Sequence, residues 1–174
     1  MSPAWSAAAF AQRTEARAAG RRRRLRRFHA AAGVVALLII ASFWSATVVV
    51  ESFGDRAAVI AVKTVIPWGF LVLVPALAFA GLTGRALGTA PASAVVRRKS
   101  RRMAFAAANG LFVLVPAALF LAAKASAGAL DDAFYVVQGL ELIAGGANVV
   151  LLTLNLTAGL RMAAARRQVM ERRR

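Results

Sequence analysis

The chain alternates between long apolar stretches and shorter polar stretches that are rich in arginine. Each apolar stretch has about 20 residues or more, which lets a helix cross about 30 Å of hydrocarbon. Four such stretches predict membrane-spanning helices at about residues 30–50, 57–82, 103–124 and 133–160. The predicted fold class is therefore all-α. Residues 30–161 are expected to form a four-helix transmembrane bundle, up-down and antiparallel.

The composition supports a location inside a membrane. The chain has 174 residues, of which 60% are hydrophobic, and its mean hydropathy is +0.64. These values are too apolar for a soluble domain and are typical of a polytopic membrane protein. Two basic segments flank the bundle: an amino-terminal arm over residues 1–29 and a tail over residues 162–174.

The distribution of positive charge predicts the orientation. The formal net charge is +16, and the basic residues concentrate in the arm, in the middle loop and in the tail. The other two loops hold only Arg56 and the boundary residue Lys124. Loops rich in Lys and Arg stay on the cytoplasmic side. Both termini and the middle loop are therefore expected in the cytoplasm, with the protein in the cell (inner) membrane.

The basic clusters beside the first and third predicted helices are expected to contact lipid. A juxtamembrane basic residue attracts anionic lipid by about 1 kcal/mol. No fold that reads bases accompanies these clusters, so the expected partner is a bilayer with anionic headgroups and not nucleic acid. The expected headgroup contacts are Arg21, Arg22, Arg23, Arg24, Arg26, Arg27, Arg97, Arg98, Arg101 and Arg102.

The last apolar stretch carries polar and small residues along one helical face. Steps of three and four residues keep this polar stripe within an arc of about 100°. Unsatisfied amides are costly in hydrocarbon, so the stripe is expected to face protein or water. A packed bundle interior and a polar pathway or ligand site are both consistent with it. The polar stripe comprises Gln138, Glu141, Gly145, Asn148, Leu152, Asn155 and Gly159. The opposite face, expected toward lipid, comprises Val136, Leu140, Ile143, Ala147, Val150 and Leu154.

Two opposite charges are predicted at similar depths. Lys63 lies about 9 Å and Glu141 about 12 Å from the outer ends of their helices, at about 1.5 Å per residue. Charges inside a bilayer are usually paired, so Lys63 and Glu141 are expected to face each other or share a pocket with Gln138. Such a pair is consistent with a structural clip, a protonatable relay or a ligand pocket. Alternatively, Lys63 reaches the outer surface and leaves Glu141 neutral.

A second polar layer is predicted nearer to the cytoplasm. Asn109 and Asn155 each lie a few residues inside their helices. At that depth antiparallel neighbours can exchange side-chain hydrogen bonds worth about 1 kcal/mol. Asn148 is expected between the two layers.

Two proline-containing segments resemble each other. Residues 69–79 and 110–120 share a central proline, Pro75 and Pro116, and each proline frees a carbonyl one turn back. An inverted repeat of the kind found in transporters and a chance similarity of apolar sequence both explain this.

The chain offers few groups for catalysis or metal binding. It contains no cysteine, which excludes thiolate metal sites and thiol nucleophiles. Its single histidine, His29, excludes paired histidine ligands within one chain. We therefore predict no enzymatic activity, no metal and no cofactor.

Three functions from different classes are compatible with these patterns. The first is a non-enzymatic accessory, assembly or regulatory component of a membrane complex, with a protein partner or a second copy of itself in the membrane. The second is a small oligomeric transporter or channel, proton-coupled through the polar face of the last helix. The third is the membrane anchor subunit of a redox enzyme, which the single histidine disfavours.

Overall fold

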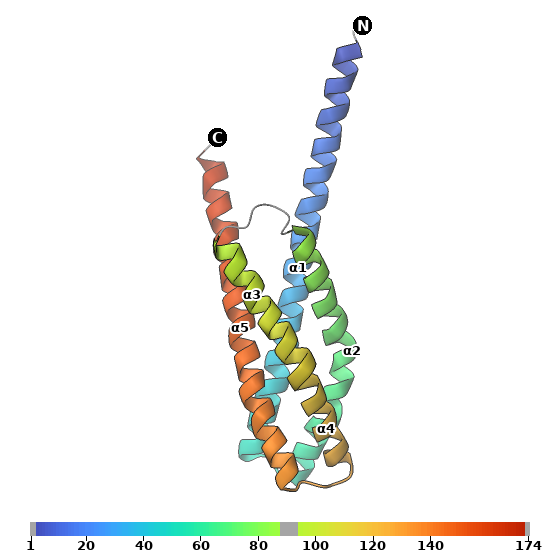
Figure 1. The fold of residues 1–174 in the computed structure, drawn as a ribbon, viewed down its shortest axis with the longest axis vertical. Coiled ribbons are helices and arrows are strands. Elements are labelled where there is room, and N and C mark those ends of the chain that lie inside the picture. Colours follow the sequence, from blue (N-terminus) through green and yellow to red (C-terminus); the bar gives the residue numbers. More distant parts are fainter. Residues whose placement is uncertain (1–2, 88–93, 173–174) are drawn as a thin grey trace.

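The computed structural model describes residues 3–87 and 94–172, and all regular structure in these ranges is helical (Figure 1). Four helices are long and apolar enough to cross a membrane: Ala9–Phe53, Arg56–Leu87, Arg97–Ser126 and Asp132–Val169. The prediction of an all-α chain with four candidate spans is confirmed to this extent. In full, the elements are α1 (Pro3–Phe53), α2 (Arg56–Leu87), α3 (Ala94–Asn109), the π-helix η1 (Gly110–Leu114), α4 (Val115–Ser126) and α5 (Asp132–Glu171).

The helices extend well past the predicted boundaries. α1 has 51 residues, so at about 1.5 Å per residue it is about 76 Å long, more than twice the hydrocarbon thickness. Residues 3–29 of the basic arm and the Arg97–Arg102 cluster are helical in this structure, because Ala, Arg and Lys are good helix formers and no proline interrupts them after Pro3. Residues 88–93 of the predicted middle loop lie outside the described ranges.

The helices pack into a bundle in which α1 contacts α2 and α5, α2 contacts α4, and α3 contacts α5. Both ends of the chain lie at one end of the bundle, which we call the terminal end (Figure 1). The α1–α2 and α4–α5 connections lie at the opposite end, the turn end. Small side chains such as Ala36, Ala106 and Ala125 are buried between helices, which lets the backbones approach closely.

The third span changes its winding at η1. Pro116 follows η1 and has no N–H to donate to the Phe112 carbonyl, so one hydrogen bond of the α-helical ladder is missing beside this turn. Pro75 lies inside α2, which stays α-helical throughout. The two similar segments therefore differ in local conformation, and the repeat stays a hypothesis.

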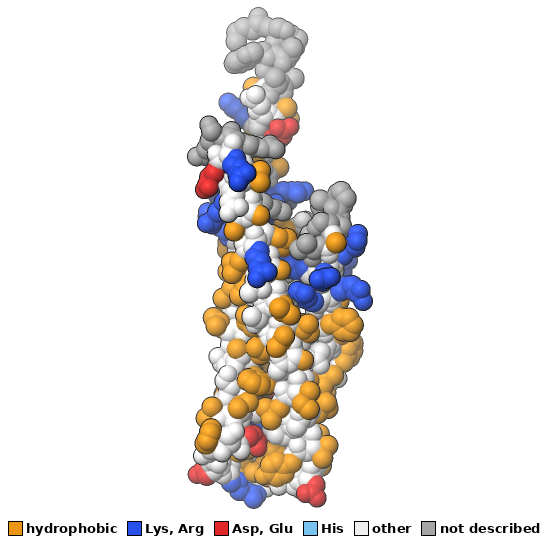
Figure 2. All heavy atoms as spheres, turned by 90° about the vertical axis from the view of Figure 1, so that its left-hand side faces the viewer, with side chains coloured by type: hydrophobic (Ala, Val, Ile, Leu, Met, Phe, Trp, Pro, Cys, Tyr) orange, Lys and Arg blue, Asp and Glu red, His pale blue; other side chains and the backbone are white. Residues whose placement is uncertain are grey.

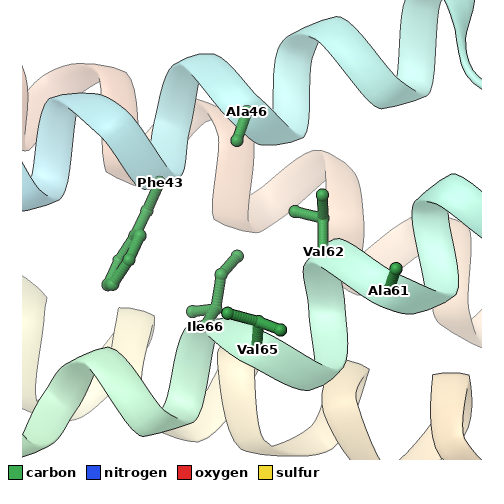
Figure 3. Close-up of a pocket in the computed structure, with 6 residues that line it drawn as sticks. All are labelled: Phe43, Ala46, Ala61, Val62, Val65 and Ile66. Carbon is green, nitrogen blue, oxygen red and sulfur yellow. The ribbon is translucent and has the colours of Figure 1, made fainter.

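The surface divides along the bundle axis. In Figure 2, Lys and Arg gather toward the terminal end, above a belt of apolar side chains. An apolar pocket of about 280 Å³ lies between α1 and α2. Figure 3 shows its lining, which consists of Phe43, Ala46, Ala61, Val62, Val65 and Ile66. Because the lining carries no polar group, this pocket suits hydrocarbon and not a polar substrate.

Candidate functional site

The polar stripe of α5 faces the inside of the bundle. Gln138, Asn148 and Asn155 are 3%, 2% and 4% exposed, respectively. All six residues of the opposite face, by contrast, are exposed. The helix therefore has the orientation expected from the cost of placing amides in hydrocarbon.

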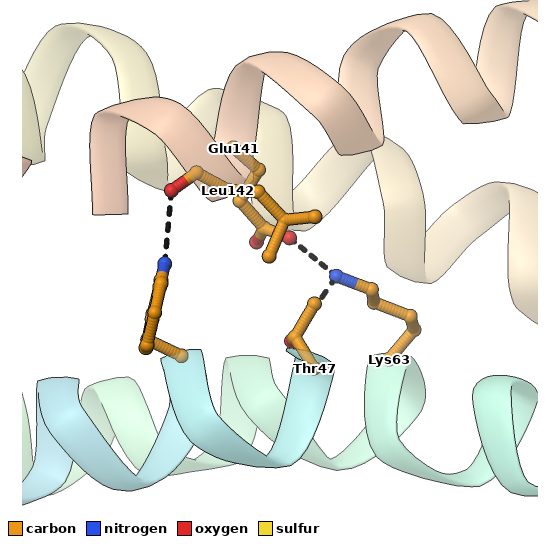
Figure 4. A network of polar contacts seen from close by, with 5 residues as sticks. Thr47, Lys63, Glu141 and Leu142 are labelled. Atoms are coloured by element: carbon orange, nitrogen blue, oxygen red, sulfur yellow. Dashed lines mark hydrogen bonds and ion pairs between the residues drawn. The ribbon is translucent and has the colours of Figure 1, made fainter. Parts of the chain in front are cut away.

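Near the turn end, the stripe meets charged and polar groups from two other helices. The Lys63 ammonium of α2 donates to the Glu141 carboxylate of α5 and forms an ion pair with it (Figure 4). Lys63 Nζ also lies 3.4 Å from Thr47 Oγ1 of α1. The Lys63 side chain is 1% exposed and that of Glu141 is 13% exposed, so the pair is almost fully removed from solvent. Lys63 does not reach the outer surface.

A second carboxylate belongs to this cluster and was missed by the sequence reasoning. The first span was predicted to end near residue 50, but α1 continues to Phe53, so Glu51 lies on the helix one turn after Thr47. It acts electrostatically on both Lys63 and Glu141, and its Oε1 is buried with no hydrogen-bond partner. We define Thr47, Glu51, Lys63, Gln138 and Glu141 as the outer polar cluster. The sequence did contain one indication of this position: Glu51 follows Thr47 by four residues, which places both on one face of a continuous helix.

Gln138 joins the outer polar cluster without bonding to the ion pair. It lies one turn from Glu141 on the buried face of α5, and neither amide atom has a hydrogen-bond partner. A buried primary amide can donate two hydrogen bonds and accept two. The cluster therefore contains two carboxylates for one ammonium, together with an amide side chain that makes no hydrogen bond.

Trp44 of α1 contacts the part of α5 that follows Glu141, and the sequence did not predict these contacts. Its indole N–H donates to the Leu142 carbonyl at 2.9 Å. The indole lies against Gly145 and Gly146, where a Cβ would come within 2.9 and 3.4 Å of ring atoms, respectively. Gly145 of the stripe and its neighbour Gly146 thus leave room for an aromatic ring from α1.

In the second polar layer, Asn109 has a different partner from the predicted one. Asn109 Nδ2 donates to Asn148 Oδ1 at 3.0 Å and to the Ala144 carbonyl at 2.9 Å. Asn148 Nδ2 in turn donates to the Ala106 carbonyl at 3.2 Å. The expected pairing of Asn109 with Asn155 is therefore wrong. The helix containing Asn109 begins at Ala94, not near Met103, so Asn109 lies deeper in the bundle than was assumed.

The arginines predicted to contact headgroups lie on the surface, at or beyond the terminal end of the bundle. Arg102 is partly buried and the other nine are exposed. His29 instead turns toward α2: its Nδ1 lies 3.0 Å from the Ala80 carbonyl and 3.1 Å from Thr83 Oγ1. Among residues 3–87 and 94–172, no three His, Asp or Glu side chains gather closely enough to hold a metal ion.

No protein-family model, curated protein or solved structure matches the chain.

Proposed function

We propose that this chain is a non-enzymatic accessory, assembly or regulatory component of a membrane complex. In this proposal it is an up-down, antiparallel bundle in the cell (inner) membrane, with both termini in the cytoplasm. The concentration of Lys and Arg toward the terminal end supports this orientation, because positively charged segments are retained on the cytoplasmic side.

One observation carries the proposal: three polar groups of α5 hold the chain's own helices together. Glu141 bonds to α2, the Leu142 carbonyl accepts from α1, and Asn148 bonds to α3. A catalytic or transport site needs polar groups directed at a substrate. A scaffold needs them between its helices, and this is how the three contacts are arranged.

The ends of α1 and α5 provide surfaces for a partner or for headgroups. Residues 11–24 of α1 are exposed throughout and include Arg13, Arg17 and the run from Arg21 to Arg24. Only about 20 residues of a helix are needed to cross the hydrocarbon, so α1 extends beyond it by about 30 residues. A long basic helix of this kind suits an acidic protein surface or anionic headgroups.

The test is purification of the full chain from native membranes in a mild detergent, followed by quantitative mass spectrometry. We expect one protein to co-purify in a fixed molar ratio. A variant with Arg21–Arg24 replaced by glutamine should reduce that ratio if the arm of α1 contributes to binding. A variant with Arg167→Gln provides a control on α5. A homogeneous preparation without a partner, obtained under conditions that preserve known complexes, would contradict the proposal.

A small oligomeric, proton-coupled transporter is the second candidate, and the outer polar cluster favours it. Glu51 and Gln138 have buried polar atoms without partners beside the ion pair, which is a suitable setting for a proton. The test is proton and solute flux in proteoliposomes. Glu141→Gln should abolish any flux, whereas Asp132→Asn, an exposed carboxylate on the same helix, should not. A flux that is equal in both variants would exclude a role for Glu141.

A further inference from the structure

A second group of buried and half-buried polar side chains lies toward the terminal end of the bundle. It includes His29 of α1, Thr83 of α2, Lys99 of α3 and Asn155 of α5, so all four spans contribute to it. We call it the inner polar cluster. It differs from the outer polar cluster because it contains cationic and amide groups but no carboxylate.

Asn155 is the least satisfied member of the inner polar cluster. Its side chain is 4% exposed, and neither its Nδ2 nor its Oδ1 has a hydrogen-bond partner. Asn148, two turns away on the same stripe, donates and accepts hydrogen bonds. Since buried amides in proteins nearly always have partners, an unpartnered one next to positive charge indicates a position for a ligand acceptor.

Lys99 supplies the charge. It is partly buried, and its Nζ lies 3.4 Å from the point where a Cβ would stand on Gly159. Gly159 follows Asn155 by one helical turn, so the ammonium lies over the same face of α5 as the free amide. Lys99 belongs to neither the Lys63–Glu141 ion pair nor the Lys124–Asp131 ion pair.

His29 and Thr83 close the cluster on the side of α1 and α2. Because the Ala80 carbonyl can only accept a hydrogen bond, its contact with His29 places the proton on Nδ1. This contact fixes the imidazole against α2, where Gly84 leaves room for the ring. Lys99 acts electrostatically on His29, so the histidine and the lysine lie in the same part of the bundle.

We propose that the inner polar cluster binds one phosphate group, supplied by the headgroup of an anionic lipid. Lys99 would pair with a phosphate oxygen, and Asn155 Nδ2 would donate to the same group. Basic pockets between membrane helices bind lipid headgroups in this way. The site differs from the exposed arginines because it is built partly from a neutral, buried side chain.

The test uses the full chain in dodecyl maltoside micelles, titrated with phosphatidylglycerol, phosphatidylcholine or inorganic phosphate. The readouts are the thermal midpoint and the number of bound lipids by native mass spectrometry. We expect one tightly bound phosphatidylglycerol. Lys99→Gln and Asn155→Leu should each weaken its apparent affinity about tenfold, which corresponds to one lost charged or polar contact. Arg85→Gln removes the same charge from an exposed position on α2 that belongs neither to the cluster nor to the expected headgroup contacts, and it should change the affinity less than about twofold.

Asn155→Leu decides between a built site and general attraction to acidic lipid, because it removes no charge. If this variant binds phosphatidylglycerol as tightly as the unaltered chain, the proposal is overturned. Lys99→Arg, which keeps the charge, serves as a second variant if Lys99→Gln does not fold, and it should retain binding to within a few-fold. A response to phosphatidylglycerol but not to inorganic phosphate assigns the site to a lipid headgroup, and the reverse assigns it to a free anion. A response to neither overturns it.

Discussion

Lys63 of α2 and Glu141 of α5 form an ion pair in the interior of the bundle, although 78 residues separate them in the chain. Placing two charges out of water is costly, and the cost is recovered only while both partners are present. The pair therefore ties α2 to α5 at one depth. Thr47 adds α1 to the same contact.

Replacing one partner of this pair should be more harmful than replacing both. We expect Lys63→Met to lower the free energy of unfolding by about 3–5 kcal/mol, because it leaves the Glu141 carboxylate uncompensated. Glu141→Met should cost less, because Glu51 still acts electrostatically on Lys63. The double variant should be more stable than either single variant. Reversible unfolding in mixed micelles measures all four values. Additive losses in the double variant would contradict direct coupling.

The charge-exchanged variant provides an independent check. Lys63→Glu combined with Glu141→Lys restores an ion pair, with the carboxylate now on α2 and the ammonium on α5. This double variant should be more stable than either single exchange. Unfolding of the three variants under the same conditions measures this difference. If the double exchange is no more stable, the two side chains are not coupled as the geometry requires.

The stripe contains two buried asparagines that should respond oppositely to the same substitution. Asn148→Leu removes bonds to Asn109 and to the Ala106 carbonyl, and we expect a loss of about 1–2 kcal/mol at about 1 kcal/mol per bond. Asn155→Leu removes an amide without partners, so in lipid-free detergent it should be neutral or stabilising. Chemical unfolding of both variants under identical conditions measures the difference. Equal losses would contradict the assigned hydrogen bonds.

Gly145 and Gly139 offer a matched pair for testing the Trp44 contact. Gly145→Ala would bring a Cβ to 2.9 Å from Trp44 Cδ1, which forces the indole to move and weakens its bond to Leu142. We expect a loss of about 1–3 kcal/mol, as is typical of overpacking. Gly139→Ala meets nothing within 4 Å and should be neutral or slightly stabilising.

The emission of Trp44 provides the second readout for this pair, in a background where Trp5 and Trp68 are replaced by phenylalanine. The emission maximum should shift in Gly145→Ala and stay unchanged in Gly139→Ala. A shift of the same size in both variants would show that the indole does not depend on Gly145.

Acid should weaken the connection between α4 and α5. Asp131 caps α5 by accepting from the Phe134 N–H at 3.0 Å, and it pairs with Lys124. The Lys124 hydrogen bond, supported by the Phe134 N–H, holds the pKa of Asp131 below its usual value of 3.8. Because the folded-state pKa is the lower one, the stabilisation is complete above about pH 3.8 and is lost as the pH falls through the folded-state pKa.

Asp131→Asn tests this assignment, because asparagine can still cap the helix but cannot titrate. The variant should be less stable than the unaltered chain at neutral pH. It should also lose less stability between about pH 5 and pH 2, a range chosen to cover the usual aspartate value. Thermal midpoints measured across this range give the result. If the thermal midpoint falls by the same amount with decreasing pH in both proteins, Asp131 does not have the proposed role.

The pattern of apolar and polar residues was enough to determine the number of candidate spans and the rotation of the last helix. Both follow from local rules: a span needs about 20 apolar residues, and amides avoid hydrocarbon. For the same reason, matching depths were enough to bring Lys63 and Glu141 together. These properties depend on the depth and face of each residue, and for Lys63 and Glu141 the apolar pattern specified both.

Only the tertiary structure determined which residues meet across the bundle. The pairing of Asn109 with Asn148 depends on where α3 begins and on the altered winding at η1, and neither follows from hydropathy. The outer polar cluster gains Glu51 because α1 continues for one turn beyond its apolar stretch. Lys99 of α3 lies over the face of α5 that carries Asn155 because α3 packs against that helix. Contacts between helices depend on relative height and crossing angle, and these are set by the packing of all four helices together.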